Sequence, residues 1–535
     1  MATTLHTLAE LVDAQLVPAV GQTAAAANDI PVASISLNSK ELGEQALFAA
    51  LPGTRAHGAK YANDAAAVAV VTDPAGLDIM VQAGGPQRPV VLVDDARAAL
   101  GALSAEIYGH PADDLTMIGV TGTSGKTTTT YLMEAGLMAA DLRVGLIGTT
   151  GTRINGEKVP SHLTTPEAPD LHRLLATMRD RGVTHVVMEV SSHALELHRV
   201  GGVAFDTAVF LNLSQDHLDF HPTMEEYFHA KTKLFQAING AAAPTPVICI
   251  NDDWGRRLAD MLTVAGRTPV TVATEATAGA ATWELIDDSV ADDGVQHATA
   301  KGPDGSTSFD VGLPGRYNIA NELVAIAALH TVGVTGTAVL EAMAKVQVPG
   351  RMERIDGGQD FLAVVDYAHK PAAIGAALTT LRAQTNGRVA IVMGAGGDRD
   401  ATKRAPMGAE SAQVADLVVV TDDNPRSEEP AAIREQVFAG ATEAAKQREP
   451  QPEVVNIGDR AEAINYAIAW ARNGDTVLVA GKGHETGQQV GDTLHHFDDR
   501  EEVARAISQR SAQRSAQRST THNDHSASPQ EGSAQ

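Results

Sequence analysis

One segment constrains the fold of this chain more than any other. The apolar run Met117–Val120 is followed by Gly122-Thr123-Ser124-Gly125-Lys126-Thr127-Thr128, and a helical pattern continues from Thr129. This order of strand, glycine-containing turn and helix points successive backbone N–H groups at one place, where the positive end of the helix also favours an anion. Lys126 supplies a positive charge for a phosphate oxygen, and Thr127 supplies a hydroxyl ligand for Mg²⁺. The segment therefore predicts a nucleoside triphosphate site in an α/β domain.

The loop departs from the common phosphate-loop pattern at one position, where Val120 stands in place of glycine. The alternative interpretation is a surface turn that happens to contain Gly, Lys and Thr. The flanking strand and helix favour phosphate binding, because they lie where the mechanism requires them.

Composition narrows the class of protein. A length of 535 residues predicts between about two and four domains. The 66 acidic and 41 basic residues give a net charge of −25, which argues against nonspecific binding to nucleic acid or to anionic membranes. The single cysteine, Cys249, suits a reducing compartment. No signal peptide pattern is seen and no apolar run reaches the roughly 18 residues of a membrane span, so we expect a cytoplasmic protein without membrane insertion.

The order of strand and helix patterns predicts an α/β fold with several domains. We expect a small α/β unit over residues 1–112, the phosphate-loop domain over 113–350 and a further α/β domain over 351–507. Residues 508–535 repeat Ser-Ala-Gln-Arg and end in a polar stretch, which predicts a disordered tail. The expected strands include Ala67–Val71, Pro89–Val93, Val186–Met188, Ala208–Leu211, Pro246–Ile250, Phe361–Val365, Val389–Met393, Leu417–Val420 and Thr476–Ala480.

Two polar segments at strand ends are candidates for metal binding. Glu189 follows the buried run Val186–Met188, where an acid of a phosphate-loop domain is placed to hold Mg²⁺. The alternative for Glu189 is a helix N-cap or a solvated acid at a strand end. The segment Asn212–Asp219 follows another strand and contains His217, for which metal ligation and a helix N-terminus with acids in its first turn are equally supported.

Three polar loops follow successive strands in the last domain. They are Gly394–Asp400, Asp423–Arg426 and Gly481–Glu485. Because the carboxyl ends of parallel strands meet at one sheet edge, we expect Arg399, Arg426, Lys482 and Glu485 to approach one ligand. Two arginines and one carboxylate suit the carboxylates and the ammonium of an amino acid.

With these segments together, the chain resembles the Mur ligases, the ATP-dependent amide-forming enzymes of peptidoglycan synthesis. The resemblance is strongest to the members that add meso-diaminopimelate to UDP-N-acetylmuramoyl-L-alanyl-D-glutamate, and it runs from about Ser39 to Arg500. It implies a three-domain architecture with a central P-loop ATPase domain and a C-terminal Rossmann-like domain. It also implies ATP and Mg²⁺ as cofactors and a monomer. The further markers are Thr164–Glu167, Met188–His193, Tyr317–Asn321, Pro349–Glu353 and Val365–His369.

The resemblance also implies roles for individual residues. Lys126, Glu189, His217 and Lys231 are the implied catalytic residues, with Thr127, Glu189, His217 and a carbamylated Lys231 organising Mg²⁺. ATP is expected at Gly122, Thr123, Ser124, Gly125, Lys126, Thr127 and Thr128, with its adenine and ribose near Asn318, Asn321, Arg351 and Asp366. The UDP-linked dipeptide is expected at Ser39, Thr54, Arg55, Ala56, Thr164, Thr165, Ser191 and Arg199. Diaminopimelate is expected at Arg399, Asp423, Asn424, Pro425, Arg426, Gly481 and Glu485.

Asp423–Arg426 favours diaminopimelate over lysine, because lysine lacks the distal carboxylate that Arg426 would pair. The alternatives are the same ligation with L-lysine and a folylpolyglutamate-synthase-like glutamate ligase. A nucleotide-dependent regulatory protein and a purely structural α/β protein are further alternatives from other classes.

Overall fold

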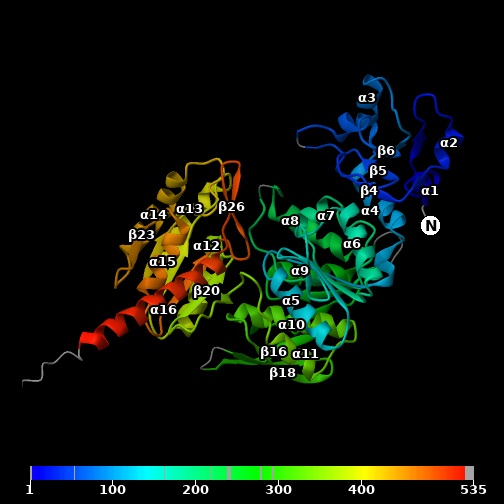
Figure 1. Ribbon diagram of the computed structural model, residues 1–535. Coiled ribbons are helices and arrows are strands. Elements are labelled where there is room, and N and C mark those ends of the chain that lie inside the picture. Colours follow the sequence, from blue (N-terminus) through cyan, green and yellow to red (C-terminus); the bar gives the residue numbers. More distant parts are fainter. Residues whose placement is uncertain are drawn as a thin grey trace, which may run out of the picture. The chain divides into compact units, whose positions relative to one another are not determined.

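The computed structural model describes residues 3–53, 55–161, 163–218, 220–237, 242–276, 280–291 and 295–524. It divides into two compact units. One contains the chain up to Val290 together with His297–Val311 and Tyr317–Val346, and the other contains Gly312–Arg316 and the chain from Gln347. Figure 1 shows the elements coloured along the sequence. The three large sheets lie within the three ranges predicted as domains, and the first two sheets belong to the same compact unit.

The N-terminal sheet is mostly parallel, with antiparallel β2 at one edge. Aspartate and threonine side chains cap its helices, as at Asp73 and Asp95. In sheet order the strands are β2 (Gln15–Val17), β7 (Val90–Leu92), β6 (Ala69–Thr72), β5 (Ala46–Ala49) and β4 (Ser34–Ser36). The other elements are β1 (Thr3–Thr4), β3 (Pro31–Val32), α1 (Leu5–Leu11), α2 (Ala24–Asn28), η1 (Gly58–Tyr61), α3 (Pro74–Gln82), α4 (Ala96–Ile107) and η2 (Pro111–Asp114).

In the central sheet, the strand that leads into the phosphate loop lies between two buried parallel strands. The strands in order are β11 (Glu157–Val159), β10 (Gly151–Ile154), β9 (Val144–Gly148), β12 (His185–Glu189), β8 (Thr116–Thr121), β13 (Thr207–Phe210), β14 (Thr245–Cys249), β15 (Val270–Ala273), β16 (Trp283–Val290), β17 (Gln296–Gly302) and β18 (Gly305–Val311). The helices are α5 (Lys126–Ala139), α6 (Ala168–Asp180), α7 (Ser192–Glu196), α8 (Met224–Thr232), η3 (Lys233–Phe235), α9 (Asp253–Val264), α10 (Arg316–Thr331) and α11 (Thr337–Met343).

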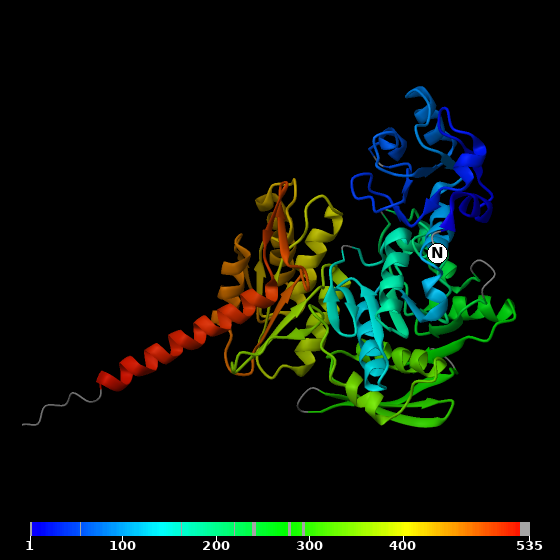
Figure 2. The same ribbon diagram turned by 45° about the vertical axis from the view of Figure 1, so that its right-hand side comes forward.

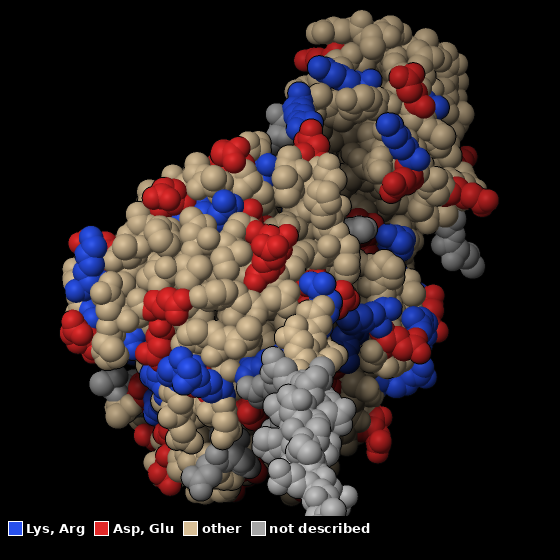
Figure 3. Space-filling view, turned by 60° about the vertical axis from the view of Figure 1, so that its left-hand side comes forward, with Lys and Arg blue, Asp and Glu red and all other residues tan. Residues whose placement is uncertain are grey.

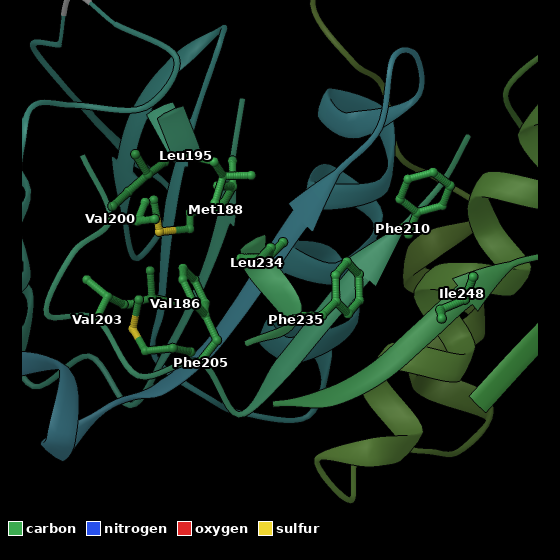
Figure 4. Packing of buried hydrophobic residues seen from close by; sticks show 14 of the residues in the cluster. Val186, Met188, Leu195, Val200, Val203, Phe205, Phe210, Leu234, Phe235 and Ile248 are labelled. Carbon is green, nitrogen blue, oxygen red and sulfur yellow. The ribbon is translucent and has the colours of Figure 1, made fainter. Parts of the chain in front are cut away.

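A buried cluster holds the strand that ends at the candidate metal site. Figure 4 shows Val186 and Met188 of β12 among Leu195, Val200 and Val203, which come from α7 and the loop after it. These side chains are at most 5% exposed. Burial of each is worth roughly 1.5–3 kcal/mol, so the position of β12 is strongly determined by packing.

The C-terminal sheet is parallel except for its short edge strand β19. Its strands in order are β19 (Glu353–Arg354), β20 (Leu362–Asp366), β24 (Thr476–Ala480), β21 (Val389–Met393), β22 (Leu417–Val420) and β23 (Glu453–Asn456). The remaining elements are the hairpin of β25 (Gly487–Val490) and β26 (Thr493–His496), with α12 (Pro371–Gln384), η5 (Ala401–Lys403), α13 (Arg404–Val414), α14 (Pro430–Ala445), α15 (Arg460–Trp470) and α16 (Asp499–Asp524).

Helix α16 corrects the predicted tail. The sequence predicted disorder over 508–535, whereas the helix continues to Asp524 and extends beyond its own sheet in Figures 1 and 2. Alanine, glutamine and arginine in the repeat all favour helix, and a helix already formed at Asp499 needs no new nucleus. Residues 525–535 lie outside the described residues. In the part of the chain that the structure describes, no helix has the length and apolarity to cross a bilayer.

Charged side chains of both signs are interspersed on the face shown in Figure 3. This pattern accompanies the net charge of −25.

Candidate active site

The phosphate loop connects β8 to α5 in the predicted strand–loop–helix arrangement. Gly125 precedes the helix with a φ of +87°. A Cβ at this position would lie 2.4 Å from Asn321 Oδ1, so both the backbone conformation and the close approach require glycine. Asn212 braces the same loop, because its Oδ1 accepts from Ser124 N at 2.9 Å and its Nδ2 donates to Ser124 O at 3.1 Å. Asn212, two residues after the end of β13, therefore holds the loop by hydrogen bonds, and Asn321 of α10 lies close to Gly125.

Two lysines converge on the loop. Lys126 Nζ donates to Gly122 O at 2.9 Å, and Lys231 Nζ donates to the same oxygen at 3.0 Å. Lys231 is 1% exposed and its ammonium lies 4.6 Å from the centre of the Tyr227 ring. A lysine on a helix ordinarily keeps its ammonium in water, so the burial of Lys231 is a departure from that behaviour.

Glu189 and Thr127 form the predicted oxygen pair. Glu189 lies opposite Val120 in the parallel register of β12 and β8, which brings its carboxylate to the end of the phosphate loop. Its Oε1 accepts from Thr127 Oγ1 at 3.0 Å and from Thr149 N at 2.8 Å. Its Oε2 accepts from Thr149 Oγ1 at 3.0 Å. Glu189 is not a helix cap, and it is 1% exposed rather than solvated.

These oxygens fit Mg²⁺. The cation prefers carboxylate, hydroxyl and phosphate oxygens and keeps several waters, and the Thr127 hydroxyl lies at the start of the helix that would face the phosphates.

His217 lies in a loop rather than in the first turn of a helix. Residues 211–218 are not helical, and the next helix, α8, begins at Met224. The N-cap alternative for this segment is therefore wrong; Asp219 lies outside the described residues. His217 has a φ of +53°, its Nε2 lies 3.3 Å from Asp216 Oδ2, and its ring meets the His193 ring at 4.9 Å.

The predicted dipeptide residues of the central domain lie beside Glu189. Thr165 Oγ1 donates to Glu189 O at 2.8 Å and accepts from Ser191 N at 3.2 Å. Thr164 Oγ1 lies 3.1 Å from Thr149 Oγ1. Arg199 Nη1 donates to Thr165 O at 3.3 Å.

Glu167 connects this group to helix α4, which follows the N-terminal sheet. Its carboxylate lies 2.9 Å from Arg199 Nε and 3.2 Å from Arg97 Nη1 at the start of α4. Ser39 follows β4, and Arg55 and Ala56 follow the neighbouring parallel strand β5, so these residues share one edge of the N-terminal sheet. Thr54 lies outside the described residues.

The residues predicted for adenine and ribose are distributed over both compact units. Asn318 Oδ1 accepts from Asn321 Nδ2 at 2.9 Å on the buried first turns of α10. In the other unit, Asp366 Oδ2 accepts from Met352 N at 2.7 Å and Oδ1 accepts from Ala368 N at 2.8 Å. The Arg351 guanidinium stacks 4.3 Å from the Tyr367 ring centre. Burial raises the pKa of Asp366, and the neighbouring Arg351 opposes this rise.

Asn424 is the centre of the loops predicted for the amino acid. Its Oδ1 accepts from Lys482 Nζ at 3.1 Å and from Gln489 N at 2.9 Å, and its Nδ2 donates to Glu485 Oε2 at 3.0 Å. These contacts join the loops after β22 and β24 to the β25 hairpin. Burial lowers the pKa of Lys482 and raises that of Glu485, and Asp423 between the loops works against the first shift and adds to the second.

Arg426 is fixed by its backbone as well as by its side chain. It has a φ of +52°, its N donates to Gln489 O at 3.1 Å, and its carbonyl accepts from Gly491 N at 2.7 Å. Its Nη1 donates to Gly397 O at 2.7 Å, so the guanidinium reaches the loop after β21. Arg399 is exposed on that same loop. Pro425 is buried against Gly397, and Gly481 has a φ of +119° beside Asp423.

Comparison with known proteins identifies the family. Residues 120–329 match the Mur ligase middle domain and residues 350–483 match the Mur ligase glutamate ligase domain. A UDP-N-acetylmuramoyl-L-alanyl-D-glutamate–2,6-diaminopimelate ligase of Corynebacterium glutamicum is 57% identical over 498 residues, which cover 92% of this chain and 95% of that protein. This chain belongs to the Mur ligase family.

Solved structures agree with this Mur ligase assignment. A structure of a UDP-N-acetylmuramoyl-L-alanyl-D-glutamate–2,6-diaminopimelate ligase has a TM-score of 0.67 at 29% identity and covers 95% of this chain and 99% of that chain. Folylpolyglutamate synthase of Mycobacterium tuberculosis, complexed with ADP and AMPPCP, has a TM-score of 0.58 at 18% identity and covers 72% of this chain and 92% of that chain. The latter shows a shared fold alone. The predicted three-domain Mur ligase fold is confirmed.

Several residues of this Mur ligase that shape the site were not predicted. Tyr227 lies over Lys231, with its hydroxyl 3.2 Å from Thr123 Oγ1, and burial raises the pKa of that hydroxyl, so it keeps its proton. Thr149 holds the Glu189 carboxylate. Neither Tyr227 nor Thr149 has a local sequence signal. Asn212 lies in the predicted segment Asn212–Asp219, but its hydrogen bonds to the phosphate loop were not predicted.

Proposed function

We propose that this Mur ligase joins meso-diaminopimelate to UDP-N-acetylmuramoyl-L-alanyl-D-glutamate at the expense of ATP, giving the UDP-linked tripeptide for peptidoglycan synthesis. The observation that carries the proposal is the 57% identity over 92% of the chain to a ligase of that name. The phosphate loop, the Glu189–Thr127 pair and the Asn424–Arg426 loop supply the chemistry that such a reaction needs.

The reaction requires activation of a carboxylate, because an amine and a carboxylate do not condense spontaneously in water. The D-Glu γ-carboxylate oxygen attacks the γ-phosphorus of ATP, and ADP leaves. The amine of diaminopimelate then attacks the acyl phosphate carbon, loses a proton, and expels inorganic phosphate from the tetrahedral intermediate. Lys126 and the loop N–H groups hold the transferred phosphoryl group, so the protein acts mainly by positioning and charge neutralisation.

Thr127, Glu189 and His217 would hold Mg²⁺, which supplies positive charge to the phosphates when bound. The Asn318–Asn321 pair and the Arg351–Asp366 group would receive the adenine and ribose. Arg199 and Thr165, next to Glu189, would position the dipeptide, whereas Ser39 and Arg55 would contact its nucleotide end.

We further propose that Lys231 carries a carbamate. A neutral Lys231 amine adds to CO₂ and releases one proton, and the product is an anion that can share the cation with Glu189. Two lysine nitrogens on the single oxygen Gly122 O support this proposal, because conversion of one ammonium to an anion relieves their repulsion. Incubation with ¹³CO₂ should give a carbamate carbon signal that is absent from Lys231→Ala, and equal signals from both proteins would contradict the assignment.

The choice of amino acid distinguishes the proposal from its alternatives. Phosphate release would be measured with ATP, the UDP-linked dipeptide and each of meso-diaminopimelate, L-lysine and L-glutamate. Two further reactions would contain ATP, a folate acceptor and L-glutamate, and ATP with the dipeptide but no amino acid. We expect release only with diaminopimelate, since Arg426 would pair its distal carboxylate, which lysine lacks. Equal turnover of lysine would contradict this selectivity, and turnover of glutamate on a folate acceptor would favour the folylpolyglutamate alternative. ATP hydrolysis that needs no acceptor amine would favour a nucleotide-dependent regulatory protein.

A further inference from the structure

The loops after β22 and β24 belong to strands that are not neighbours. In the C-terminal sheet, β21 lies between them. Two strand spacings separate the strand ends by about 9–10 Å, so ladder hydrogen bonds alone do not fix the distance between Asp423 and Gly481. Another contact must bridge the two ends if the loops are to hold one ligand precisely.

Arg460 makes this bridge. It is the first residue of α15 and its side chain is 0% exposed. Its Nη2 donates to Ala480 O at 2.9 Å, and its Nη1 reaches Asp422 O at 3.4 Å. Ala480 is the last residue of β24 and directly precedes Gly481, while Asp422 directly precedes Asp423. One guanidinium therefore contacts the backbone immediately before both loops.

Asp499 fixes the orientation of this guanidinium. Arg460 Nε donates to Asp499 Oδ1 and Nη2 donates to Oδ2, both at 2.7 Å. Both side chains are 0% exposed. A buried ion pair contributes little net stability compared with apolar side chains, but the paired fork allows only one orientation of the arginine. The pair is thus better suited to set geometry than to stabilise the fold.

The side chains on the two loops depend on that geometry. Lys482 Nζ lies 3.8 Å from Asp423 Oδ1 and 3.7 Å from Glu485 Oε2. Asn424 joins Lys482 and Glu485 with two hydrogen bonds of 3.1 and 3.0 Å. A shift of one loop relative to the other by about 1 Å would break these contacts, and a misplacement of that size can cost about a hundredfold in rate.

We propose that the Arg460–Asp499 pair is a positioning device that sets the distance between the Asp423–Arg426 and Gly481–Glu485 loops. The pair thereby determines the KM for diaminopimelate, although it touches no substrate. This inference rests on the proposed function, because it assigns the two loops to the amino acid.

The test compares Arg460→Lys with Arg388→Lys. Arg388 also pairs with a buried aspartate of the same domain, Asp475, with Nη2 2.7 Å from Oδ2. The two residues directly precede β21 and β24, at the opposite edge of the sheet from the loops. Lysine keeps the charge but loses the fork. We expect Arg460→Lys to raise the KM for diaminopimelate about tenfold or more, with the KM for ATP unchanged, and Arg388→Lys to change neither.

A second variant tests the same inference if Arg460→Lys does not fold. The double variant Arg460→Met, Asp499→Leu removes both buried charges at similar volume and should fold, with the same rise in the KM for diaminopimelate. A folded double variant or Arg460→Lys protein with the wild-type KM for diaminopimelate would overturn the inference, as would an equal rise in Arg388→Lys. If wild-type protein releases no phosphate with diaminopimelate, the proposed function fails instead.

Discussion

Glu189→Gln removes the negative charge at the end of β12 and keeps the shape of the side chain. The carboxylate receives three hydrogen bonds, from Thr127 Oγ1, Thr149 N and Thr149 Oγ1, at 3.0, 2.8 and 3.0 Å. An amide whose oxygen takes the Oε1 position keeps the first two. Its nitrogen then faces Thr149 Oγ1, which can accept as well as donate. We therefore expect the free energy of unfolding to change by about 1 kcal/mol or less.

Activity should respond far more strongly. The lost charge is one of the groups that would hold Mg²⁺ beside the transferred phosphoryl group. Removal of one preorganised electrostatic partner typically costs about 2.7–4 kcal/mol in the transition state, or about 10²–10³ in kcat. The Mg²⁺ concentration for half-maximal activity should rise as well, because one ligand has lost its charge.

Phosphate release at saturating ATP, dipeptide and diaminopimelate, titrated with Mg²⁺, measures both quantities. Glu134→Gln is the matched control, since Glu134 is 3% exposed in α5 and pairs with Arg153 at 3.2 Å rather than with the phosphate loop. We expect the control to keep its kcat and its Mg²⁺ dependence. If Glu189→Gln behaves like the control in both respects, the assignment of Glu189 to the cation is refuted. A loss of kcat matched by an equal loss of folded protein would refute the isosteric argument.

Two further outcomes can be measured on single variants. Arg426→Ala should lower kcat/KM for diaminopimelate by about 10- to 150-fold, the loss of about 1.5–3 kcal/mol from hydrogen bonds to a charged group; unchanged steady-state kinetics would exclude the residue from amino-acid recognition. Glu134 should make wild-type stability depend on pH, because burial raises the pKa of its carboxyl to about 7 while the nearby Arg153 opposes the shift. A raised acid pKa stabilises the folded state fully below the unfolded value, so up to about 3 kcal/mol is lost as pH rises from about 4.5 to 7. Thermal melts of wild type and Glu134→Gln should therefore converge as pH falls below that window, with wild type becoming relatively less stable above it, and parallel curves would contradict the shift.

Local sequence patterns were sufficient to predict many of the strands and the phosphate loop. The strand, glycine turn and helix at Gly122–Thr128 follow from backbone preferences within a few residues. The buried strands, such as Val389–Met393 and Leu417–Val420, follow from short apolar runs between turn signals. Glu189 was found because it directly follows the apolar run Val186–Met188, and Arg426 because its polar loop follows the strand Leu417–Val420.

Other contacts join residues that no local pattern connects. Lys231 reads as an ordinary lysine on a helix, and only the packing of α8 against the phosphate loop buries it over Tyr227. The SAQR repeat was predicted disordered from its composition, whereas a helix begun at Asp499 continues through the repeat to Asp524.

The sequence by itself determined the phosphate loop, the α/β class and the polar loops at strand ends, because these depend on neighbouring residues. Only the tertiary structure decided which loops meet. The order β24–β21–β22 separates two loops that we propose act on one ligand, and Arg460, held by Asp499, contacts the backbone immediately before each loop. Such a bridge depends on sheet order and on burial, which no spacing along the chain encodes.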